Sequence, residues 1–129
     1  AELAVESNLD ALIATNTTIE RSGLSASAQT IESMGPGGLS GAPLQQRARE
    51  VTALLARQLN RRVPLISVGG IDSGEEVYRR IRLGASAVQI YSAIIYQGPW
   101  LAVRMARELD RSLHRDGFSH VQQAIGVDL

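Results

Sequence analysis

Residues 64–84 read Pro-Leu-Ile-Ser-Val-Gly-Gly-Ile-Asp-Ser-Gly-Glu-Glu-Val-Tyr-Arg-Arg-Ile-Arg-Leu-Gly, and this stretch determines the expected fold. The apolar run 64–68 has the length and the Leu, Ile and Val content of a buried strand. Ser73 followed by Glu76 is typical of a capping box, in which each side chain binds a free backbone N–H at a helix start. Gly84 follows where a helix ends on a left-handed residue. The stretch therefore predicts a strand, a two-glycine turn and a helix.

The same unit repeats along the chain. Two further apolar runs, 11–14 and 87–91, have strand length, and runs that are apolar on both faces suit parallel strands covered by helices. Apolar residues at three- and four-residue steps over 44–59 predict a helix, and Pro99 suits the first turn of a last long helix. This alternation predicts an α/β fold with parallel strands and right-handed crossovers. We expect about three βα units of a TIM (β/α)8 barrel.

Length and composition predict one globular unit. The 129 residues are 44% hydrophobic and 20% charged, so we expect a single partial domain over 1–129. The 13 basic and 13 acidic residues cancel, which argues against a nucleic-acid partner. Cysteine is absent, so no disulfide or thiolate metal site is expected. No apolar run approaches the roughly 18 residues of a membrane span. Residues 1–5 read as the end of a helix, so we expect sequence upstream.

The end of the first strand and the loop after it carry residues suited to ligand binding. Residues 13–18, Ile-Ala-Thr-Asn-Thr-Thr, follow a strand with small polar side chains that can hydrogen-bond a planar heterocycle or a carboxylate. A polar strand-to-loop junction explains the pattern equally well. Residues 19–42 form a long Gly-rich loop, and its glycines let the backbone approach a ligand. A flexible linker is the alternative for this loop.

The other two strand ends together predict a phosphate site. Gly69 and Gly70 follow the second strand and can present backbone N–H groups to a phosphate at a helix start. A tight βα turn without a ligand is the alternative for these glycines. Ser92 follows the third strand and can donate a hydroxyl. In barrel folds the loops after two successive late strands often bind phosphate. The pair indicates the phosphate of a cofactor or substrate, without specifying which.

Five motifs carry a resemblance to a known family. They are Ile-Ala-Thr-Asn-Thr-Thr at 13–18, Gly-Leu-Ser-Gly at 38–41, Val-Gly-Gly-Ile at 68–71, Leu-Gly-Ala-Ser at 83–86 and Gln-Ile-Tyr-Ser at 89–92. In this order and spacing they resemble class 2, quinone-linked dihydroorotate dehydrogenases. The resemblance covers nearly the whole chain and implies the C-terminal part of that family's barrel. The run Ala-Thr-Asn-Thr-Thr favours class 2 over the soluble class 1 enzymes.

The resemblance implies a cofactor, a substrate and the residues that hold them. The cofactor is FMN, which supplies the redox chemistry, and the substrate pair is dihydroorotate and orotate. Five residues are implied to contact FMN: Thr15, Gly41, Gly70, Tyr91 and Ser92. Of these, Tyr91 and Ser92 are implied to bind its phosphate end. The residues implied to hold the substrate are Asn16 and Thr17.

The resemblance also implies an activity that this chain does not complete. The family oxidises dihydroorotate in pyrimidine biosynthesis and passes electrons to a quinone, at the bacterial inner membrane or the mitochondrial inner membrane. In that family the catalytic base is a serine, and a lysine side chain reaches FMN. Both residues are expected upstream of this chain. This chain has no lysine. We therefore expect no catalytic residue here, and a soluble chain that is inactive alone, because loss of a base costs ~100- to 10,000-fold in rate.

Two other functions stay open. One is a fragment of a different FMN barrel, such as a class 1 enzyme or an α-hydroxy-acid oxidase. The other is a non-catalytic half-barrel that self-associates through its exposed sheet edges. Away from the motifs, Arg79, Arg80 and Arg82 are expected to form a solvated helix face, and Trp100 is expected to pack the last helix.

Overall fold

Three parallel strands form one sheet in this computed structural model, which describes residues 1–129. They are β1 (Leu12–Ala14), β2 (Leu65–Val68) and β3 (Ala87–Gln89), in the spatial order β1-β2-β3. The register pairs Ile13 with Ile66, and Ser67 with Val88. All three predicted strands are confirmed, and their parallel order places their carboxyl ends at the same edge of the sheet.

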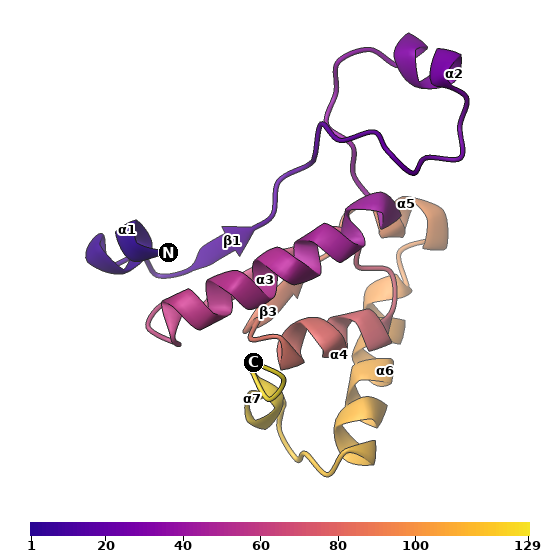
Figure 1. The fold of residues 1–129 in the computed structure, drawn as a ribbon. Helices are drawn as coiled ribbons and strands as arrows, with labels where there is room; N and C mark the ends of the chain where they lie inside the picture. Colours follow the sequence, from indigo (N-terminus) through magenta and orange to yellow (C-terminus); the bar gives the residue numbers. More distant parts are fainter.

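Helices follow the strands. The described helices are α1 (Glu2–Glu6), α2 (Ala28–Ser33), the 3₁₀ turn η1 (Ala42–Leu44), α3 (Gln45–Leu59), α4 (Gly74–Arg82), α5 (Ser92–Gln97), α6 (Leu101–Arg115) and α7 (Val121–Ala124). Figure 1 shows α3 and α4 over the same face of the sheet, with α6 packed against α4. None of the helices combines the length and the apolar character needed to cross a membrane.

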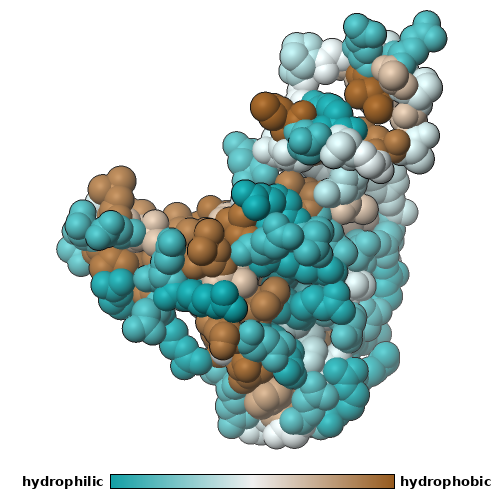
Figure 2. Space-filling model, viewed as in Figure 1, coloured by the Kyte–Doolittle hydropathy of each residue, from teal (hydrophilic) through white to brown (hydrophobic).

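Two apolar clusters hold these elements together. One joins α4, α6 and α7, and its most buried members include Leu101 and Ala124, both at 0% exposure. The other joins α1, β1, β2 and α3 around Leu59. The opposite face of β1 is open, since Ile13 is 54% exposed. Apolar surface also gathers around α1 in Figure 2. Helices thus cover one face of the sheet. The other face, which corresponds to the interior of a barrel, is open.

The loop 19–42 has structure of its own. It begins beside an antiparallel bridge between Thr18 and Leu39, and six of its residues form α2. The loop projects away from the sheet in Figure 1. The Thr18–Leu39 bridge brings the two ends of the loop together, so the residues just after Leu39 return to the end of β1.

Helix ends differ from the sequence expectations in three places. Ser73 Oγ accepts a hydrogen bond from the N–H of Glu76 at 3.3 Å, but the Glu76 carboxylate turns to Arg49 and Arg80, so only half of the capping box forms. The last long helix begins at Leu101 rather than at Pro99. The short helix α5 precedes it and takes up residues 92–97 of the expected loop, and the third strand ends at Gln89 rather than at Tyr91.

The expected solvated arginine face is wrong. Arg80 is completely buried, Arg79 is half-exposed, and Arg82 forms ion pairs with Asp116 at 3.1 Å and Asp128 at 2.6 Å. Successive helical residues point about 100° apart, so Arg80 points away from the face that Arg79 and Arg82 share. Trp100 is also 77% exposed and does not pack into the core.

Candidate functional site

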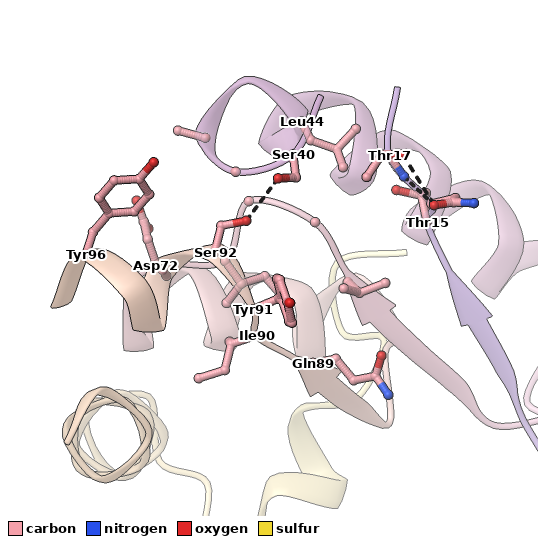
Figure 3. Close-up of a pocket in the computed structure, with 18 of the residues that line it drawn as sticks. Thr15, Thr17, Ser40, Leu44, Asp72, Gln89, Ile90, Tyr91, Ser92 and Tyr96 are labelled. Atoms are coloured by element: carbon pink, nitrogen blue, oxygen red, sulfur yellow. Dashed lines mark hydrogen bonds between the residues drawn. The ribbon is translucent and has the colours of Figure 1, made fainter. Parts of the chain in front are cut away.

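A cavity of about 770 Å³ opens at the carboxyl ends of the three strands. All seven of the predicted site residues line it, and they are Thr15, Asn16, Thr17, Gly41, Gly70, Tyr91 and Ser92. Figure 3 shows Thr15 and Thr17 toward one end of this cavity and Tyr96 toward the other. Gly70 and Ser92, from successive βα units, border the same space, as the sequence predicted.

The end of β1 contributes a buried hydroxyl that has no partner within the chain. Thr15 Oγ1 is buried and has no hydrogen-bond partner in the chain. Its neighbour Asn16 is used partly within the turn, because Asn16 Oδ1 accepts from the N–H of Thr17 at 2.8 Å. A buried hydroxyl without a partner costs stability unless something satisfies it. Thr15 therefore marks a position where a polar ligand atom would be favourable.

The loop before α3 closes the cavity from the side of β1. Gly38 packs directly against the Thr17 side chain, where a Cβ would overlap it. Two residues on, Ser40 Oγ lies 3.0 Å from Ser92 Oγ, an interaction visible in Figure 3. Gly41 has a φ of +81°, a conformation that favours glycine. This loop thus joins the end of β1 to the end of β3, and the two hydroxyls meet at the cavity wall.

The end of β2 contributes a turn that only glycine fits. Gly69 and Gly70 have φ values of +115° and +70°. A Cβ on Gly70 would lie 2.7 Å from the backbone N of Gln45 at the start of α3. Gln45 Nε2 donates to the carbonyl of Gly70 at 2.8 Å, and Arg80 Nη2 donates to the carbonyl of Gly69 at 2.8 Å. These contacts hold the turn closely against α3 and α4, on the side away from the cavity.

The cavity wall itself carries little charge. No arginine lines it, and its one ionisable carboxyl group belongs to Asp72. The nearby charges lie behind the glycine turn, where Glu76 bonds both Arg49 and Arg80. The hydrogen bond that Arg49 donates to Glu76 raises the pKa of Arg49, whereas burial lowers the pKa of Arg80. Neutral hydroxyls, amides and backbone N–H groups are therefore the polar groups that the wall could offer to a ligand.

Some lining residues were not predicted. Ser40 lies inside the Gly-Leu-Ser-Gly motif, so its neighbour Gly41 could have indicated it. Tyr96 and Gln97 lie on α5, and Gln97 Nε2 donates to the carbonyl of Asp72 at 3.0 Å. No sequence pattern pointed to these two, because α5 itself was not foreseen. The structure shows no cluster of side chains that could hold a metal ion.

Parallel βα units whose glycines and hydroxyls converge on a cavity at the carboxyl ends of the strands are typical of α/β barrel proteins. The family model for dihydroorotate dehydrogenase matches residues 1–113. The chain belongs to the dihydroorotate dehydrogenase family. The family predicted from the five motifs is confirmed.

Relatives in this family are similar along the whole chain. The chain is 52% identical over 127 residues to a dihydroorotate dehydrogenase (quinone) of Cereibacter sphaeroides, covering 98% of this chain and 35% of the relative. It is 46% identical over 129 residues to the protein of the same name from Thermobifida fusca, covering 34% of that protein. The chain therefore spans about a third of the length of the curated relatives it matches.

Solved structures agree on the fold. A ligand-free DHODH from Eimeria tenella matches with a TM-score of 0.90 at 42% identity, covering 99% of this chain and 35% of that one. A complex of the Eimeria tenella DHODH with ferulenol matches with a TM-score of 0.89 over 98% of this chain and 33% of that one. These matches confirm the predicted barrel fold, of which the chain contains three parallel strands.

Proposed function

We propose that this chain forms part of the FMN site and the substrate site of a dihydroorotate dehydrogenase that uses a quinone as electron acceptor. The cavity at the carboxyl ends of the strands carries the proposal, because all seven implied ligand residues line it. The whole enzyme would oxidise dihydroorotate to orotate in pyrimidine biosynthesis, next to a bacterial inner or mitochondrial inner membrane where the quinone is dissolved.

The residues present fit FMN. A volume of about 770 Å³ falls within the ~300–1,000 Å³ typical of cofactor sites. The Thr15 hydroxyl has no partner in the chain, so a polar atom of the flavin would satisfy it. Gly70 and Ser92 offer a close backbone approach and a hydroxyl, which are the groups that phosphate needs. We assign the phosphate end of FMN to Gly70, Tyr91 and Ser92, and backbone contact to Gly41.

Asn16 and Thr17 are the residues we assign to the substrate. Both line the cavity beside Thr15, and an amide with a hydroxyl can both donate to and accept from a pyrimidine ring. FMN supplies the hydride acceptor when it is bound. The chain's own residues bind and orient the two molecules. We assign no base among residues 1–129, and propose that a serine outside this chain removes the proton, so that the chain alone does not turn over.

Flavin titration tests the site. FMN fluorescence, followed while the purified chain is added, measures the dissociation constant. The change Ser92→Ala removes one hydroxyl donor and should weaken FMN binding about tenfold, the value of one hydrogen bond of ~1.4 kcal/mol. Ser33→Ala is the matched control, since Ser33 Oγ only donates to the carbonyl of Thr30 on the remote helix α2. Equal affinities in these two variants would contradict the assigned site.

Activity tests the second part of the proposal. The chain is incubated with FMN, dihydroorotate and a quinone analogue, and orotate is followed by its ultraviolet absorbance. No orotate is expected above a control without protein. Measurable turnover by the chain alone would show that the base lies within residues 1–129 and would overturn its assignment elsewhere.

Self-association is a second candidate, favoured by the free edges of the sheet. The structure pairs β1 and β3 only with β2, and Leu3, Ile13 and Leu54 are each more than half exposed around β1. We propose that two copies cover these surfaces by contact with each other. Analytical ultracentrifugation should then show a concentration-dependent dimer that Ile13→Lys weakens. A monomer at all concentrations would exclude this candidate.

A further inference from the structure

We propose that Arg80 is a positioning residue for the phosphate end of the site, acting through the Gly69–Gly70 turn. This inference rests on the proposed FMN function and deepens it. Arg80 does not line the cavity and is completely buried beneath the turn. It touches neither the cavity nor solvent, so any effect on the ligand must pass through the turn or through its charge.

The guanidinium of Arg80 reaches four acceptors from three directions. Nη2 donates to the carbonyl of Gly69 at 2.8 Å and to the carbonyl of Gln45 at 3.1 Å. Nη1 donates to Ser67 Oγ at 2.9 Å, and Nε donates to Glu76 Oε1 at 2.6 Å. These contacts tie the end of β2, the start of α3 and helix α4 to one planar group. A lysine ammonium lacks this fork and could not bond all four.

The bonds behind the turn leave its N–H groups free. Arg80 binds the carbonyl of Gly69, and Gln45 Nε2 binds the carbonyl of Gly70. The N–H groups of Gly69, Gly70 and Ile71 donate to no acceptor in the chain, and all three residues line the cavity. Successive free N–H groups form a concave site for an anion. Holding both carbonyls from behind keeps the turn in the conformation that presents these donors.

The charge behind the turn has the sign that a phosphate needs. Arg49 and Arg80 share the one carboxylate of Glu76. Arg79 also pairs with Glu76 at 3.9 Å, and Asp72 interacts with Arg49, so these three arginines and two carboxylates carry a net charge of +1. The cavity wall has no arginine, and the chain contains no lysine. The exposed fractions of the Arg80 and Glu76 side chains are 0% and 3%, so water screens the charge of Arg80 only weakly, whereas Arg49 and Arg79 are 21% and 48% exposed.

Paired titrations with FMN and riboflavin separate positioning from simple stability. Riboflavin has the same ring system without the phosphate, so it reports on the rest of the site. Arg80→Met should weaken FMN binding at least about tenfold and riboflavin binding less than about twofold. Arg80→Lys keeps the charge, and its FMN affinity should lie between those of the wild type and Arg80→Met. Inorganic phosphate should compete with FMN in the wild type and less well in Arg80→Met.

Arg82→Met is the matched control. Arg82 lies two residues further along α4, and its acceptors Tyr78, Asp116 and Asp128 all lie outside the cavity lining. This variant should leave both flavin affinities unchanged. If Arg80→Met does not fold, Gln45→Ala replaces it, because it frees the carbonyl of Gly70 and should weaken FMN selectively about threefold or more.

Each outcome decides the inference. A selective loss of FMN affinity in the Arg80 variants, or in Gln45→Ala if they do not fold, supports it. Parallel losses for FMN and riboflavin, or unchanged FMN affinity, would overturn it and leave the flavin site intact. A wild-type chain that binds FMN no better than riboflavin, or binds neither, would overturn the proposed phosphate site and this inference together.

Discussion

Replacing Gly70 by alanine should destabilise the chain through two separate effects. Gly70 has a φ of +70°, where a residue with a Cβ is strained by about 1–2 kcal/mol. The added Cβ would also lie 2.7 Å from the N, Cα and Cβ of Gln45, and such overpacking costs about 1–3 kcal/mol. The sum, about 2–5 kcal/mol, is a large part of the ~5–15 kcal/mol that stabilises a domain.

Urea unfolding followed by circular dichroism measures this loss. With a slope of about 2 kcal/mol per molar urea, the midpoint of Gly70→Ala should fall by about 1–2.5 M. Gly117→Ala is the control, since Gly117 has a φ of +81° and no heavy atom within 4 Å of an added Cβ. The control carries the strain without the overlap and should lose about 1–2 kcal/mol. Equal losses in the two variants would refute the close packing of the glycine turn on α3.

Three further changes test the core and the electrostatics. Thr52→Val removes a fully buried hydroxyl that lies 2.7 Å from Ser67 Oγ and should cost about 1–2 kcal/mol in urea unfolding, whereas an unchanged midpoint would show that this hydrogen bond contributes nothing. Leu101→Ala empties a position with 0% exposure between α4 and α6 and should cost about 2–5 kcal/mol in the same assay, and a loss under 1 kcal/mol would contradict that burial. The hydrogen bond from Arg115 is the largest cause that holds the pKa of Asp116 at about 2 instead of 3.8, so this stabilisation is full above pH 3.8 and is lost as the pH falls toward 2. Asp116→Asn should therefore flatten the decline of Tm between pH 4 and pH 2, and parallel profiles for variant and wild type would contradict the assignment.

Much of the site could be predicted from sequence because its chemistry is local. Strand runs, the glycines before α4 and the small polar residues after β1 and β3 are each set by a few neighbouring positions. Parallel strands place all their carboxyl ends at one edge, so residues 15, 70 and 92 could be expected to meet before any coordinates were known. The cavity contains them all.

The amino-acid sequence by itself determined the alternation of strands and helices, the glycine turn and the family, since these depend on periodicity and on motifs read along the chain. Only the tertiary structure decided which way Glu76 and Arg80 point. A capping box and a solvated arginine were the local expectations, yet the carboxylate turns to Arg49 and Arg80, and Arg80 is buried. The physical reason is that a buried charge requires a partner and hydrogen bonds on every side. Those partners come from β2, α3 and the glycine turn, which lie far apart in the sequence until the chain folds.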